Sequence, residues 1–148
     1  METPNDNNAV VPIIDGRNPD WQIEQAIRLY RQAQAHIHLL NVQAALPKHV
    51  SRFFHSAQLS AFHQENGMRL LEPVARRLDE AGVPCELHVM VGPKAETILH
   101  FAREFDCGRI VMEESAESWM SALGLGSISS QLQHLMKVRH FGVPLGGA

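Results

Sequence analysis

Short apolar segments alternate with amphipathic segments along almost the whole chain, and this alternation constrains the fold more than any other feature. The expected strands, in chain order, are Val10–Ile14, His36–Val42, Cys85–Val91 and Arg109–Met112, with a weak fifth within Val138–Leu145. Continuous apolar runs of this length are typical of strands covered on both faces. Because parallel strands need crossover connections, this order predicts an α/β fold with an open parallel sheet and helices on both faces.

The segments between the expected strands place apolar residues at helical spacing. The expected helices are one capped by Asn18 or Asp20, one from about Phe54 to Ala81, one that begins at Pro93, and one from about Ser127 to Met136, with a loop over residues 43–52. Gly82 supplies the left-handed residue that commonly ends a helix, so the long helix should stop there. Gly67 and Pro73 weaken that helix, because neither residue favours a helix interior.

The length and the charge of the chain limit its architecture and its partners. With 148 residues the chain can bury one sizeable core, and we expect a disordered tail over residues 1–9 and one domain over residues 10–148. The net charge is −3 and no segment concentrates Lys or Arg, which disfavours nucleic acid as a partner. No apolar run approaches the roughly 18–20 residues that span a bilayer, so we expect no membrane contact.

The N-terminal residues and the two cysteines predict a cytoplasmic protein. Met1–Asn8 is polar and lacks the basic start and the apolar stretch of a signal peptide. Cys85 and Cys107 match no metal-binding spacing and are too few for a disulfide framework. We therefore expect two buried, reduced thiols.

Three motifs, in this order and spacing, resemble the universal stress protein family. They are Val10–Gly16 (apolar strand, Pro, apolar pair, Asp-Gly), Gly92–Ile98 at the entry to the third helix, and Ile110–Met112 followed by Gly126–Ser129. The resemblance covers nearly the whole chain after residue 9. It implies a Rossmann-like, five-stranded sheet of order 3-2-1-4-5 and a homodimer.

The phosphate loop of the ATP-binding relatives is incomplete in this sequence. In those relatives the loop after the fourth strand reads Gly, two residues, Gly, nine residues, then Gly-Ser or Gly-Thr. Counting back from Gly126 places Ala116 and Glu113 at the first two glycines. A carboxylate about 4 Å from a phosphate charge repels it by about 4 kcal/mol at an effective dielectric near 20, roughly a thousandfold in affinity. The chain is therefore expected to be a divergent member that does not hold ATP in the family's usual way.

The resemblance also assigns the positions of the family's nucleotide site. These positions are Pro12, Asp15, Val42, Met112, Glu113, Ala116, Gly126, Ser127 and Ile128. Asp15 matches the acid that contacts adenine, and Val42 matches the residue whose backbone meets the base. Two local interpretations stay open beside this one: Asp15 as an ordinary turn residue, and Ser127 as an ordinary helix N-cap.

Catalytic and metal-binding patterns are missing from the sequence. It contains no G-x-S-x-G elbow and no H-E-x-x-H pattern. His36 and His38 would share one face of a strand, but no third ligand stands at a recognisable spacing. We expect scattered histidines, no metal site and no catalytic residue.

Two functions are compatible with these sequence features. The first is a non-catalytic stress-response or signalling module that has no bound cofactor and acts through a homodimer or through protein partners. The alternative is an ATP- or AMP-binding switch that uses Asp15, Val42 and Gly126-Ser127. Slow ATP hydrolysis is a third reading, and it would need the phosphate loop that is missing.

Overall fold

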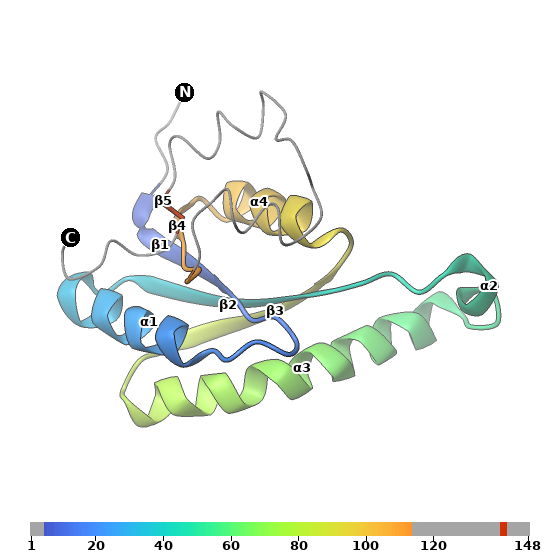
Figure 1. The fold of residues 1–148 in the computed structure, drawn as a ribbon, viewed down its shortest axis with the longest axis horizontal. Coiled ribbons are helices and arrows are strands. Elements are labelled where there is room, and N and C mark those ends of the chain that lie inside the picture. The colour runs from blue at the N-terminus through green and yellow to red at the C-terminus, as the bar shows by residue number, and fades with distance from the viewer. Residues whose placement is uncertain (1–4, 114–139, 142–148) are drawn as a thin grey trace.

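A parallel β-sheet with helices on both faces makes up the computed structural model of the chain, which describes residues 5–113 and 140–141 (Figure 1). The strands are β1 (Asn5–Pro12), β2 (His36–Gln43), β3 (Cys85–Val91), β4 (Cys107–Ile110) and β5 (His140–Phe141). The helices are α1 (Asp20–Ala33), α2 (Lys48–Ser51), α3 (Ser56–Glu80) and α4 (Lys94–Glu104).

Every pair of neighbouring strands is parallel, and the main strands follow the order β3-β2-β1-β4. Beside β4, the two residues of β5 pair with Arg109 and Ile110. The predicted α/β fold with a parallel sheet is therefore confirmed. The remainder of Val138–Leu145 and the predicted helix over Ser127–Met136 lie outside the described residues.

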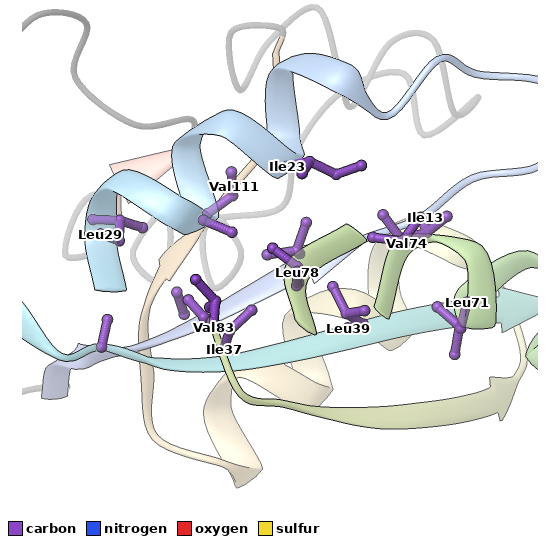
Figure 2. Close-up of a cluster of buried hydrophobic side chains, with 14 residues drawn as sticks. Ile13, Ile23, Leu29, Ile37, Leu39, Leu71, Val74, Leu78, Val83 and Val111 are labelled. Carbon is purple, nitrogen blue, oxygen red and sulfur yellow. The ribbon is translucent and has the colours of Figure 1, made fainter. Parts of the chain in front are cut away.

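Helices α1 and α3 cover one face of the sheet and α4 covers the other (Figure 1). Figure 2 shows the apolar side chains buried between the sheet and the first two of these helices. This cluster joins Ile23 of α1 and Leu78 of α3 to Leu39 of β2. A second cluster on the opposite face packs Ile98 and Phe101 of α4 against strand residues such as Leu40. Both faces of the sheet are thus buried, as the continuous apolar strands predict.

The N-terminal strand begins earlier than the sequence indicates. Residues 5–9 belong to β1, so the predicted disordered tail is wrong for these residues, while residues 1–4 lie outside the described part of the chain. The backbone gives the physical reason: Ala9 pairs with Ile37 of β2 on one side and with Arg109 of β4 on the other. A central strand gains its hydrogen bonds from the main chain, which the polar side chains at its start do not prevent.

The remaining differences from the predicted ranges are small. Helix α2 forms within residues 43–52, where we expected a loop; β4 spans Cys107–Ile110 rather than Arg109–Met112; and β1 ends at Pro12 rather than Ile14. The long helix ends as predicted: Gly82 has φ +76°, and the Val83 N–H donates to the Leu78 carbonyl at 2.8 Å. Within the parts that the structure describes, no helix is both long and apolar enough to cross a membrane.

Candidate functional site

The connections of the sheet reverse direction beside β1. From β1 the chain builds β2 and then β3 on one side, and it then crosses over to place β4 on the other side. In open parallel sheets, ligands bind in the crevice at the carboxyl ends of the strands at such a switch point. The candidate site is therefore the place where β1 and β4 end together.

A pocket of about 160 Å³ lies at this place. The described residues that line it are Pro12, Ile14, Arg17, Asn18, Gln22, Met112 and Glu113. Pro12 and Ile14 come from the end of β1 and the turn after it, and Met112 and Glu113 follow β4. Its volume is below the range of about 300–1,000 Å³ that is usual for small-molecule sites.

The side chain of Gln22 closes the floor of the crevice. Gln22 lies in the first turns of α1 and is buried, and its Nε2 donates to the Pro12 carbonyl at 2.6 Å and to the Val111 carbonyl at 2.9 Å. These carbonyls belong to the ends of the two strands that meet at the switch point. The Gln22 side-chain amide therefore links α1 to the ends of β1 and β4. It also occupies two carbonyl oxygens that would otherwise be available to a ligand.

The turn after β1 brings Asp15 to the surface. The Arg17 N–H donates to the Ile14 carbonyl at 3.1 Å, and Gly16 adopts φ +83° in the third position of this turn. A positive φ in that position is available to glycine at little cost. Asp15 itself is exposed, and it is not among the residues that line the pocket. The N-cap of α1 is Pro19, which makes no side-chain capping bond, so the predicted cap at Asn18 or Asp20 is wrong. Asn18 lies one residue before the N-cap, and its Oδ1 accepts from the Asp20 N–H at 2.8 Å.

The carboxyl end of β2 is held by a buried amide. Asn41 is buried, and its Nδ2 donates to the Ile13 carbonyl at 2.8 Å, while the Gln43 side chain donates to the Asn41 Oδ1 at 2.6 Å. The last pair between β1 and β2 joins Pro12 to Leu40. Val42 therefore lies past the end of β1 on that side, and only 6% of its surface is exposed.

The structure brings together some of the positions that the sequence assigns to a nucleotide site. Pro12, Met112 and Glu113 line the same pocket, whereas Asp15 and Val42 lie outside its lining. The other assigned positions, Ala116, Gly126, Ser127 and Ile128, lie outside the described residues.

Gln22 and Asn41 are the site residues that sequence reasoning missed. The signal available for Gln22 was a polar side chain beside Ile23 on the apolar side of a predicted helix. For Asn41 it was a lone amide inside an apolar strand.

The charges at the pocket have opposite sign, and both lie at its exposed rim. Arg17 follows the turn after β1, and Glu113 follows β4. Within the part of the lining that the structure describes there is no Ser, Cys or His, and thus no nucleophile with a neighbouring base. This part of the site can hold a small polar or planar group and orient it, which is the chemistry of binding.

The fold and the pocket together define an open, doubly wound α/β protein with its pocket at the switch point. The model of the universal stress protein family matches residues 7–139, which is most of the chain. The chain belongs to the universal stress protein family. No curated protein sequence gives a significant match.

Solved structures of universal stress proteins share this fold. One, from the universal stress protein family of Burkholderia pseudomallei, is 20% identical with a TM-score of 0.61, covering 95% of this chain and 99% of that chain. A universal stress protein in complex with cAMP is 16% identical with a TM-score of 0.55, covering 93% and 95%. A family protein from Arabidopsis thaliana with AMP bound is 18% identical with a TM-score of 0.50, covering 78% and 82%. At these identities the likeness concerns the fold.

Proposed function

We propose that this chain is a cytoplasmic, non-catalytic stress-response or signalling module whose switch-point pocket does not hold ATP in the way of its ATP-binding relatives. The observation that carries the proposal is the Gln22 bridge, because it occupies the two strand-end carbonyls at the floor of the crevice. The pocket of about 160 Å³ and the Glu113 carboxylate at its rim support the same conclusion. The two cysteines of the chain are too few for the disulfide framework of a small secreted domain, which agrees with a reducing compartment.

The electrostatic support comes from Glu113 and its place in the sequence. Glu113 stands where the ATP-binding relatives have the first glycine of the phosphate loop, and its side chain is exposed beside the pocket. A negative side chain there repels phosphate groups, and it lacks the freedom with which glycine lets backbone N–H groups approach them.

Ligand release and titration test the proposal directly. The full chain is purified without added nucleotide and denatured, and the released small molecules are identified by mass spectrometry; ATP and AMP are then titrated calorimetrically with Mg²⁺ present. We expect no stoichiometric ATP and a Glu113→Gln variant that binds ATP more tightly than the unmodified protein. The matched control is Glu96→Gln on α4, an exposed acid outside the pocket lining, which should change nothing. Stoichiometric ATP from the unmodified protein would contradict the proposal.

A smaller adenosine ligand, of which AMP is the example, is the second candidate. Pro12 and Met112, both assigned from the family's nucleotide site, line one pocket in this structure. Similar folds have been solved with cAMP and with AMP bound. Saturable, one-to-one binding of AMP, weakened by Asp15→Asn, would favour this candidate over a module without a ligand.

We also propose that the module acts as a homodimer, or through protein partners, as the resemblance of its sequence to the family implies. Sedimentation equilibrium of the full chain over a range of concentrations tests this proposal. A molecular mass twice that of the 16.5 kDa chain is expected. A monomer at all concentrations would direct the search to partners of other kinds.

A further inference from the structure

Two imidazoles and a carboxylate meet on the α4 face of the sheet, on strands β2 and β3. His38 of β2 stands opposite Glu86 of β3 in the register of the two strands, and His88 lies two residues beyond Glu86. Side chains two residues apart in a strand share a face, so this register places all three groups together. Their nearest ligand atoms all lie within 4.8 Å of one another.

The distances within this cluster suit a small tetrahedral centre. The His38 Nδ1 lies 3.1 Å from the His88 Nε2 and 3.6 Å from the Glu86 Oε2. Two nitrogens bound to a tetrahedral Zn²⁺ at 2.0–2.1 Å are about 3.3 Å apart. The two nitrogens are therefore already close to this spacing, while the exposed Glu86 carboxylate, within 4.8 Å of both, has to move closer to complete the site.

Aromatic side chains from α4 and its end form a wall behind the two histidines. The rings of Phe101 and Phe105 are stacked with centroids 4.2 Å apart, and the His88 ring meets them edge-on at 4.8 and 5.1 Å. His38 is buried and His88 is half-buried, whereas 63% of the Glu86 side chain is exposed. The cluster thus has an aromatic inner side and an exposed outer side through which an ion and a water molecule can enter.

The proton balance of the histidine pair is compatible with an ion. Between two neutral rings 3.1 Å apart, one nitrogen donates its proton and the other accepts it. When that proton moves to the other nitrogen of its own ring, the His38 Nδ1 and the His88 Nε2 both present lone pairs to one point, and the rings stay neutral. Burial lowers the pKa of both histidines, which keeps them in the neutral form that binds metal.

We propose that His38, His88 and Glu86 form a binding site for a divalent transition-metal ion of the zinc class, with a water molecule as the fourth ligand. Two imidazole nitrogens favour Zn²⁺, Co²⁺ or Ni²⁺ over Mg²⁺ and Ca²⁺, which prefer oxygen ligands. The site lies between β2 and β3, whereas the pocket described above lies at the ends of β1 and β4. A bound ion joins the edge strand β3 to its neighbour β2 through side chains.

Calorimetric titration of Zn²⁺ into the tag-free, chelator-treated full chain is the experiment, with Co²⁺ absorption spectra as a second readout. We expect one Zn²⁺ per chain, a higher melting temperature with Zn²⁺, and visible Co²⁺ bands of the intensity that four-coordinate sites give. His88→Phe and Glu86→Gln should each weaken Zn²⁺ binding by at least about 10–100-fold, the loss that removal of an outer partner of a ligand already causes. Glu86 is exposed, so Glu86→Gln keeps the test valid if His88→Phe fails to fold.

The matched control is His100→Gln on α4. His100 forms an exposed pair with Glu104 at 3.4 Å, which offers an ion one imidazole and one carboxylate without a third ligand from residues 5–113 or 140–141. Zn²⁺ affinity should be unchanged in this variant. The proposal is overturned if the folded, unmodified chain binds no Zn²⁺ stoichiometrically, if Glu86→Gln binds it as tightly as the unmodified chain, or if His100→Gln abolishes binding.

Discussion

Gly67 of α3 lies directly against the side chain of Val89 of β3. A Cβ atom placed on Gly67 would stand 2.5 Å from the Val89 Cγ2 and 2.6 Å from its Cγ1, distances that real side chains do not adopt. The residue that weakens α3 as an isolated helix therefore allows the helix to approach the sheet closely. The sequence shows the glycine, and the structure shows the reason for it.

Gly67→Ala should destabilise the protein by about 1–2 kcal/mol, measured by urea unfolding. Overpacking costs about 1–3 kcal/mol, and the helix propensity of alanine returns up to about 1 kcal/mol. Val89 is β-branched, so it cannot rotate away from the added methyl group without strain. The exposed Ser60→Ala in the same helix is the control and should be nearly neutral. In a Val89→Ala background, Gly67→Ala should lower the free energy of unfolding by less, because the two clashing methyl groups of Val89 are gone. An unchanged loss of stability in that background would mean that the strain does not come from Val89.

Gln22→Ala should lower the free energy of unfolding by about 1–3 kcal/mol, because it leaves the Pro12 and Val111 carbonyls without their donor. Gln22→Glu should lower it further, since a carboxylate cannot donate to these oxygens and places a charge in a buried position. Chemical denaturation of both variants is the measurement. A Gln22→Ala variant as stable as the unmodified protein would show that the hydrogen bonds contribute little.

Replacement of Gln25, one turn further along α1, should not destabilise the protein as replacement of Gln22 does. Gln25 is buried, and its Oε1 has no hydrogen-bond partner among the residues that the structure describes. Replacement by an apolar side chain of similar size removes an unsatisfied group, so Gln25→Leu should be neutral or stabilising by up to about 1 kcal/mol. A clear loss of stability, measured as for Gln22, would mean that this oxygen has a partner after all.

The Asp20–Arg77 pair should make stability depend on acid pH. The Arg77 Nη1 donates to the Asp20 Oδ1 at 2.6 Å, and this hydrogen bond lowers the pKa of Asp20. A lowered pKa gives a contribution that is present above the ordinary Asp pKa of about 3.9 and is lost as pH falls through the folded value. The effect is small because both side chains are exposed. NMR titration should show a higher Asp20 pKa in Arg77→Gln, and the difference in urea midpoint between the two proteins should shrink from pH 5 to pH 3.

The two thiols should differ in reactivity. Burial, with a smaller contribution from Asp79, raises the pKa of Cys85, and Cys107 is fully buried. Because the thiolate is the reactive form, iodoacetamide at pH 7.5 should modify Cys85 more slowly than a small free thiol and should modify Cys107 only on unfolding. Timed alkylation with peptide mass spectrometry measures both rates. Rapid labelling of Cys107 in the folded protein would contradict the tight packing of β4.

Hydrophobic pattern alone predicted the parallel sheet and most of its elements, because the inner strands are largely buried on both faces and α1, α3 and α4 each bury one apolar stripe. The hydrophobic pattern did not predict the start of β1. Asn5–Asn8 are polar, and they belong to the strand because their main chain pairs with the neighbouring strands. The pattern also failed at the short helix α2, which has no buried residue to reveal it.

The candidate site was predictable only in part. Pro12, Met112 and Glu113 follow strands whose ends the pattern locates, so their meeting at one pocket follows from the topology. The Gln22 bridge and the His38–His88 contact each depend on the register between segments distant in sequence, which a single sequence does not reveal.

The position of β1 at the middle of the sheet has a consequence for synthesis of the chain. One edge of β1 is covered by β2, which the ribosome makes soon afterwards, and the other by β4, which is made only after α3, β3 and α4. Chains fold from the N-terminus as they emerge, and a bare strand edge invites pairing with another chain. Until Cys107–Ile110 are translated, every nascent chain thus carries its most central strand half-uncovered. We therefore expect pairing with neighbouring chains to compete with folding most strongly before β4 has been made.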